Sequence, residues 1–287
     1  MSVLQKADAN RCDRPLGDSP DRSYAGKLER FSRFIEPELQ QIFSDLQLPS
    51  SGVVLDVGCG TGLATAVLAQ NVSDDVTVVG LDLSFPHLRS ARLVHDLPLI
   101  QADMERSCIK DRSVDLIWCC NAINHTADAE IVLRSLQRCL KHDGRIAMAQ
   151  SGLLAEMFFA WDAHLDDALR SACHEYYRER YGLSCHATAD VRGLIGVLHR
   201  AGFDEVESKT YIIERTQPLG SIDREYFQHA IFEGLWGERL RRYIDADIER
   251  KLDVYCDPRS PEFWLDRTDF HHLQTLTVCQ ACVPPEP

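Results

Sequence analysis

The sequence lacks an excess of positive charge. Its 31 Lys and Arg residues stand against 44 Asp and Glu residues, which gives a formal net charge of -13 at pH 7. Such a chain repels the phosphate backbone of DNA and RNA, and no basic stripe interrupts the acidic average. The composition therefore argues against a nucleic acid as substrate and favours a small molecule.

A long apolar run is also missing from the beginning of the chain. Residues 1–22 are polar and rich in Asp and Arg, so we expect a mobile tail there and neither a signal peptide nor a membrane span. The 11 cysteines are scattered and odd in number. Without an export signal they predict reduced thiols in a cytoplasmic protein.

The sequence has few Cys and His residues at the spacings typical of metal sites. Cys279 and Cys282 have the C-x-x-C spacing, but no second pair completes a tetrahedral zinc site. His271 and His272 are adjacent, so in a strand they would face opposite ways and could not chelate one ion together. We therefore expect a protein without a bound metal.

What the sequence does have is a regular alternation of apolar runs and helical patterns. Two amphipathic helices are expected first, near residues 28–35 and 39–46. Strands are then predicted at 53–57, 76–81, 97–101, 114–119, 145–149, 205–213 and 273–279, with helices at 62–70, 86–94 and 191–201 and another on Ile131, Leu136 and Leu140. This alternation predicts an α/β fold with a parallel sheet and crossover helices.

The chain is expected to divide into four parts. These are a tail (1–22), cap helices with the first part of the core (23–150), a helical insertion that caps the substrate (151–188), and the rest of the core (189–287) with a second insertion at 217–269. Aromatic residues gather in both insertions. Ordinary packing explains such residues, but two aromatic insertions could also form a roof over an apolar substrate.

A glycine-rich loop follows the first predicted strand. Glycines at 58, 60 and 62 would let the backbone approach a ligand closely. The same geometry serves NAD, but the spacing here is G-x-G-x-G and not G-x-G-x-x-G. Asp56 precedes the first glycine, where a carboxylate does nothing for a pyrophosphate but can pair with the α-amino group of a methionine moiety.

The next two strands end in polar groups that suit an adenosine. Asp82 lies twenty positions after Gly62, where a carboxylate can accept both hydroxyls of a ribose. Asp103 can accept from an exocyclic amine, and Met104 can contact a purine face. Each aspartate alone could be a helix cap or a solvated turn residue. Together the strand ends predict one ligand that contains adenosine and methionine.

These segments resemble known motifs. Residues 54–62 resemble motif I of the class I SAM-dependent methyltransferases, 79–84 resemble motif II, and 102–104 resemble the adenine-binding motif, within a similarity that spans 53–149. The small-molecule enzymes grouped with quinone biosynthesis are the most similar. The resemblance implies a Rossmann-like, doubly wound, seven-stranded sheet with the last strand antiparallel, plus helical cap insertions. It assigns donor binding to Asp56, Gly58, Cys59, Gly60, Gly62, Asp82, Leu83, Asp103, Met104 and Asn121.

The acceptor side offers one candidate for catalysis. His125 follows the fourth strand, where open α/β sheets bind ligands, and its ordinary pKa suits a general base; a structural histidine before a helix is the alternative. The strand ends at 119–121 and 150–152 carry no carboxylate for Mg²⁺. We expect SAM-dependent methyl transfer to an O, N or C atom of a small acceptor, releasing S-adenosyl-L-homocysteine. A SAM-binding protein without transfer and an NAD-dependent oxidoreductase are the alternatives, and a homodimer is compatible with the sequence.

Overall fold

A mixed β-sheet forms the centre of the molecule in the computed structural model, which describes residues 22–106, 109–123, 126, 128–151, 157–181 and 193–285. The strand order is β3-β2-β1-β4-β5-β8-β6, and β7 also pairs with β8. The strands are β1 (Gly52–Val57), β2 (Val76–Asp82), β3 (Leu99–Gln101), β4 (Val114–Cys120), β5 (Leu140–Ser151), β6 (Phe158–Phe159), β7 (Asp204–Thr216) and β8 (His271–Cys282). Neighbours among β1 to β5 are parallel, whereas β8 runs antiparallel to β5, β6 and β7.

This architecture confirms the doubly wound α/β sheet with an antiparallel last strand. All seven expected strands are present, and a two-residue strand, β6, adds an eighth. In β6, Phe158 pairs with Leu273 and Phe159 with His272. The additional strand lies within the first aromatic segment, so it fixes that segment to the upper half of β8.

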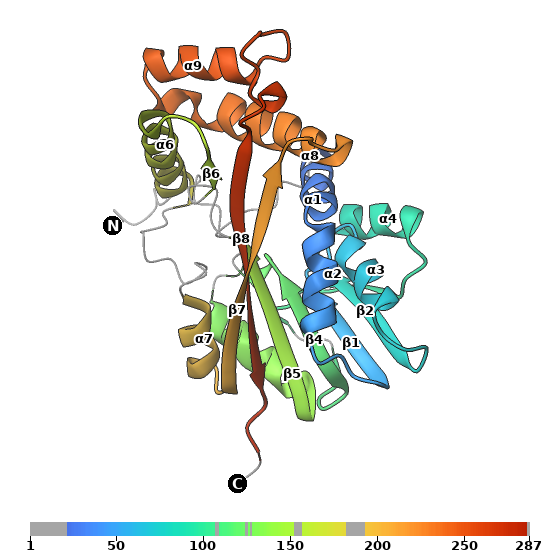
Figure 1. Cartoon of the computed structure of the whole chain (residues 1–287). Helices are drawn as coiled ribbons and strands as arrows, with labels where there is room; N and C mark the ends of the chain where they lie inside the picture. Colours follow the sequence, from blue (N-terminus) through green and yellow to red (C-terminus); the bar gives the residue numbers. More distant parts are fainter. Residues whose placement is uncertain are drawn as a thin grey trace, which may run out of the picture.

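Helices cover both faces of the sheet (Figure 1). They include α3 (Leu63–Gln70), α4 (Phe85–Val94), α5 (Ala129–Cys139) and α7 (Leu194–Arg200). In α5 Leu136 is buried as predicted, but Ile131 is 61% exposed, and Val132 and Leu133 are buried in its place. Leu140, expected to continue the helix, begins β5.

The two amphipathic helices at the beginning of the described chain are also confirmed. They are α1 (Arg22–Phe34) and α2 (Glu36–Asp45), with Pro37 in the first turn of α2. Leu39, Ile42 and Phe43 of α2 are buried in the core. The upper helix, α1, contacts α3 and α4 of the core as well as the segment Tyr226–Leu240, so it joins the core to the structure above it.

Above the sheet stands a helical lid, which we define as residues 157–181 and 217–269. Its helices are α6 (Ala163–Tyr181), α8 (Ser221–Glu225), the π-type helix η4 (Tyr226–Leu240), η5 (Arg241–Tyr243), α9 (Ala246–Cys256) and η6 (Trp264–Asp266). Figure 1 shows β7 and β8 extending from the sheet up to these helices. The lid interior is rich in buried aromatic rings, among them Phe159, Phe227, Phe232, Trp236, Phe263 and Trp264.

Candidate functional site

The loop between β1 and α3 requires its glycines. Gly58, Gly60 and Gly62 have φ angles of 76°, 55° and 82°, a region that side chains rarely adopt. A Cβ added to Gly58 would lie 2.3 Å from Ala122 Cβ, so a larger residue would also collide there. At Gly60 the nearest atom, Leu28 Cδ1, would be 3.7 Å away. The loop is therefore held in a conformation that only glycines adopt easily, and its residues are mostly buried at the carboxyl edge of the sheet.

Asp82, at the end of β2, is bonded to this loop. Its Oδ2 accepts a hydrogen bond from the backbone N–H of Gly60 at 2.8 Å, and its Oδ1 accepts one from the N–H of Ser84 at 2.8 Å. His87 Nδ1 lies 3.6 Å from Oδ1. Because a carboxylate can accept about four hydrogen bonds, Asp82 keeps acceptor capacity for the two hydroxyls of a ribose.

Asp56, at the end of β1, is only 1% exposed. Its Oδ2 accepts a hydrogen bond from Thr65 Oγ1 at 2.6 Å. Burial raises the pKa of Asp56 to about 7, the hydroxyl of Thr65 opposes that rise, and the charge of Asp82 adds to it. A cation beside this carboxylate would favour its ionised form.

The residues assigned to the adenine lie on the neighbouring strand end. Asp103 is half-buried, and its Oδ1 accepts a hydrogen bond from the N–H of Glu105 at 2.9 Å in a turn after β3. The methyl carbon of Met104 would be 3.7 Å from a Cβ on Gly58, so Met104 packs against the glycine loop. Leu83, which is 38% exposed, offers its side chain beside this edge.

Cys59 and Asn121 have mainly structural contacts. The Cys59 thiol is buried against Gly80, and burial raises the pKa of the thiol, which keeps it neutral. Asn121 has a φ of 50°, and its Oδ1 accepts hydrogen bonds from the N–H and Oγ of Ser151 at 2.8 and 3.0 Å. Asn121 therefore joins the ends of β4 and β5.

All the residues assigned to donor binding lie at the carboxyl ends of β1 to β4 or in the loops that follow them. His125 lies outside the described residues. Sequence reasoning missed three contacts here, which are the hydroxyl of Thr65, the imidazole of His87 and the Leu28 side chain over the loop. No motif in the sequence pointed to them, because each becomes a neighbour only when a helix folds back over the loop.

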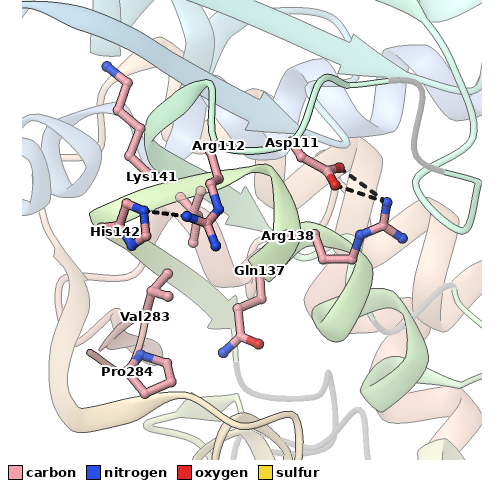
Figure 2. Close-up of a pocket in the computed structure, with 9 residues that line it drawn as sticks. Asp111, Arg112, Gln137, Arg138, Lys141, His142, Val283 and Pro284 are labelled. Carbon is pink, nitrogen blue, oxygen red and sulfur yellow. Dashed lines mark hydrogen bonds and ion pairs between the residues drawn. The ribbon is translucent and has the colours of Figure 1, made fainter. Parts of the chain in front are cut away.

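A polar pocket of about 260 Å³ lies at the opposite, amino end of β4 and β5 (Figure 2). Its basic side chains already have partners, since Arg138 is bonded to Asp111 and Arg112 to His142. This pocket is remote from the glycine loop and is not part of the candidate site.

Two other expectations concern possible metal ligands. Cys279 is buried and Cys282 is half-buried, and their odd spacing of three places them on opposite faces of β8. His271 and His272 also face opposite ways, as expected, with His271 bonded to Glu214 and His272 buried. Among the described residues no group of three or more His, Cys, Asp or Glu side chains is arranged to hold a metal ion.

Known proteins show the same domain. Residues 55–148 match the methyltransferase domain family. The chain is 27% identical over 223 residues to a malonyl-[acyl-carrier protein] O-methyltransferase of Marinomonas sp., covering 75% of this chain and 81% of that relative. It is 24% identical over 205 residues to the ubiquinone/menaquinone biosynthesis C-methyltransferase UbiE of Pectobacterium carotovorum, covering 64% and 81%. Residues 55–148 are therefore a class I SAM-dependent methyltransferase domain.

Solved structures agree with this methyltransferase in fold. A putative methyltransferase from Bacillus halodurans aligns with a TM-score of 0.53 and 19% identity, over 86% of this chain and 99% of that chain. A phosphoethanolamine N-methyltransferase 2 from Haemonchus contortus, in complex with S-adenosylhomocysteine, aligns with a TM-score of 0.50 and 17% identity, over 86% and 52%. The donor of this methyltransferase is SAM. In the described ranges no helix is long and apolar enough to cross a membrane.

The curated relatives are matched to different extents. The chain spans about half of a demethylmenaquinone methyltransferase from Lactobacillus johnsonii, 49% of its length at 29% identity. It spans 63% of the methyltransferase GfsG of Streptomyces halstedii at 28% identity. These relatives differ in name and in the share of their length that is matched, so the acceptor has to be argued from the structure of this methyltransferase.

Proposed function

We propose that this methyltransferase transfers the methyl group of SAM to an O, N or C atom of a small acceptor with an apolar, aromatic body. One observation carries this proposal. The aromatic interior of the lid lies beyond the carboxyl edge of the sheet, because β8 passes the end of β5 at the Ser151–Leu276 pair and its first residues pair with β6 of the lid. A small molecule held by the lid would reach the carboxyl edge of the sheet, where open α/β sheets bind their ligands.

The donor site is proposed to fit SAM through four side chains. Asp82 would accept the ribose hydroxyls, Asp56 would face the α-amino group, Asp103 would accept from the adenine amine, and Met104 would cover the purine face. The glycine loop supports this assignment, because Gly58, Gly60 and Gly62 all have positive φ angles and carry no side chain between the loop backbone and a ligand. SAM supplies a methyl group that the positive charge on sulfur already activates. The residues of the chain then have to hold the acceptor's nucleophile in line with the methyl–sulfur bond and to exclude water.

His125 is proposed as the residue that removes a proton from the acceptor where the reaction requires it. It follows β4, the strand whose end Asn121 ties to Ser151. The ends of β4 and β5 carry amide and hydroxyl groups and no carboxylate, so no Mg²⁺ is needed in this scheme.

The lid favours an apolar acceptor over an anionic one. Arg215, on the upper part of β7, is bonded to Glu38 at 2.7 Å and to Asp223 at 2.9 Å, and its guanidinium lies 4.5 Å from the Phe34 ring centre. Its charge is therefore already balanced. A free carboxylate in this aromatic interior would pay a large desolvation cost without that partner.

Transfer of tritium from [methyl-³H]SAM to a panel of phenols, arylamines and carboxylic acids tests the proposal, with EDTA in a parallel series. We expect turnover with aromatic acceptors, unchanged by EDTA, and mass spectrometry then identifies the methylated atom. A protein that binds S-adenosylhomocysteine but methylates nothing in the panel would favour the SAM-binding scaffold. The homodimer and the cytoplasmic location stay predictions.

A further inference from the structure

His272 occupies an unusual position on the upper half of β8. It is 0% exposed and surrounded by rings, with centroid distances of 4.6 Å to Phe159, 4.8 Å to Phe227 and 6.1 Å to Phe34. Neither of its ring nitrogens has a hydrogen-bond partner in the described part of the chain. Burying a polar group in this way costs free energy that an apolar side chain would not.

Other polar groups nearby are also buried without a hydrogen-bond partner. Gln274 lies two residues further along β8, is 3% exposed, and its Oε1 has no partner among the described residues. The indole N–H groups of Trp161 and Trp264 are likewise buried and unpaired there. Trp161 stacks on Phe159 at 4.8 Å and lies 5.4 Å from Trp264, so His272 and both indoles belong to one aromatic cluster, with Gln274 two residues along β8. Several unpaired polar groups in one apolar cluster point to a ligand that supplies the partners.

The spacing of residues along β8 gives the distance from His272 to the strand ends. His272, Gln274 and Leu276 share one face of β8, because successive side chains alternate. Leu276 pairs with Ser151, whose N–H is bonded to Asn121 at the strand ends. At about 3.4 Å per residue, Gln274 lies roughly 7 Å and His272 roughly 14 Å above that level along the strand.

The imidazole of His272 is uncharged. Burial lowers its pKa to about 3, and the charges of Arg215 and His271 lower it further, while the side chain of Gln274, which is near His272 but not in normal hydrogen-bond geometry, opposes them weakly. A neutral imidazole offers one donor and one acceptor. Such a group matches a hydroxyl or keto oxygen better than a carboxylate, which would lie in the same apolar cluster without a cation of its own.

Resting on the proposed function, we propose that His272, with Gln274 beside it, binds an uncharged oxygen at the far end of an elongated aromatic acceptor. The acceptor's other end would lie at the strand ends, where its nucleophile meets the methyl group. His272 is then a residue that determines specificity, because it selects acceptors by an oxygen that does not react.

Two rod-shaped phenols test this inference. 4,4′-Dihydroxybiphenyl carries a hydroxyl at each end, and 4-phenylphenol lacks the far one. Calorimetric titration into the protein saturated with S-adenosylhomocysteine should show the dihydroxy probe binding roughly five- to tenfold more tightly, the size of one hydrogen bond between neutral groups. His272→Phe should abolish that preference and leave the affinity for 4-phenylphenol unchanged, whereas His272→Gln should retain part of it.

His271→Leu is the matched control. His271 is on the same strand but faces the opposite way and is bonded to Glu214, so its replacement should keep the preference. Equal affinities of the two probes in the wild type, a preference that survives in His272→Phe, or binding of neither probe would overturn the inference while leaving the donor site standing. A wild-type protein that fails to bind S-adenosylhomocysteine would refute the proposed function and this inference with it.

Discussion

The carboxylate of Asp82 and the backbone N–H of Gly60 are joined by a hydrogen bond of 2.8 Å. This bond links the end of β2 to the middle of the glycine loop, 22 positions earlier in the chain. Asp82 therefore helps to fix the loop conformation. If it also binds the ribose, as we propose, one side chain both shapes the donor site and takes part in it.

Replacing Asp82 with Ala should weaken S-adenosylhomocysteine binding by about 10- to 150-fold, because charge-assisted hydrogen bonds of about 1.5 to 3 kcal/mol are lost. Titration calorimetry measures this change. Asp115→Asn is the matched control, since Asp115 also accepts a backbone N–H, that of Val53 at 2.8 Å, but lies at the other end of β4. Equal weakening in both variants would reduce Asp82 to a structural role.

Replacing Gly58 with Ala should nearly abolish donor binding and destabilise the protein by more than about 2 kcal/mol, because a positive φ and a collision with Ala122 combine. Gly60→Ala meets only the positive φ and should cost about 1 to 2 kcal/mol. Urea unfolding with and without S-adenosylhomocysteine separates the two variants. If Gly58→Ala proved as mild as Gly60→Ala, the close approach of the loop to Ala122 would be wrong.

The raised pKa of Asp56 predicts a pH-dependent effect. Because its pKa in the folded protein is about 7 against an ordinary 3.8, the folded state favours the protonated form, and stability is lost as the pH rises toward 7. The Asp56→Asn variant does not lose stability in this way, because its amide does not ionise. Its unfolding free energy should exceed that of the wild type by an amount that grows from about pH 4 to pH 7, at up to about 1.4 kcal/mol per pH unit, and levels off above pH 7.

Urea unfolding of both proteins at several pH values measures this difference, and a difference that stays constant with pH would contradict the raised pKa. S-adenosylhomocysteine should also bind Asp56→Asn less tightly, since an amide cannot pair with the α-amino group as a carboxylate does.

Much of the arrangement of the candidate donor site could be predicted because it depends on local rules. The carboxyl ends of parallel strands meet at one edge of a sheet, so Asp56, Asp82 and Asp103 could be brought together from the strand pattern alone. The glycine requirement was equally local, and the φ angles of Gly58 and Gly60 agree with it. These features need no knowledge of tertiary packing.

The parts that sequence reasoning missed depend on tertiary packing. In α5 several apolar residues are consecutive, so more than one helical face was compatible with the pattern, and packing buried Val132 and Leu133 beside the predicted Leu136 but left Ile131 exposed. Strand β6 has only two residues and no periodicity to recognise. From the sequence, His272 was considered only as a possible metal ligand together with His271. Its burial among aromatic rings, which suggests a role in acceptor binding, is visible only in the structure.

His125 should affect the rate and not the donor affinity. We expect His125→Ala to lower kcat/KM by roughly 10² to 10⁴, the usual range for loss of a general base, with S-adenosylhomocysteine affinity within about threefold of the wild type. A residue that only orients the acceptor would give a smaller fall, carried by KM. Wild-type kinetics in a variant with an unchanged Tm would place His125 among the structural residues.

Ligand-dependent stability tests the central claim most directly. The Tm of the wild-type protein should rise with increasing S-adenosylhomocysteine, because a ligand that binds only the folded state stabilises it by mass action. NAD and NADH at the same concentrations should leave the Tm unchanged. A rise with NADH as large as that with S-adenosylhomocysteine, or no rise with S-adenosylhomocysteine at saturating concentrations, would contradict the assignment of the glycine loop and Asp82 to a SAM site.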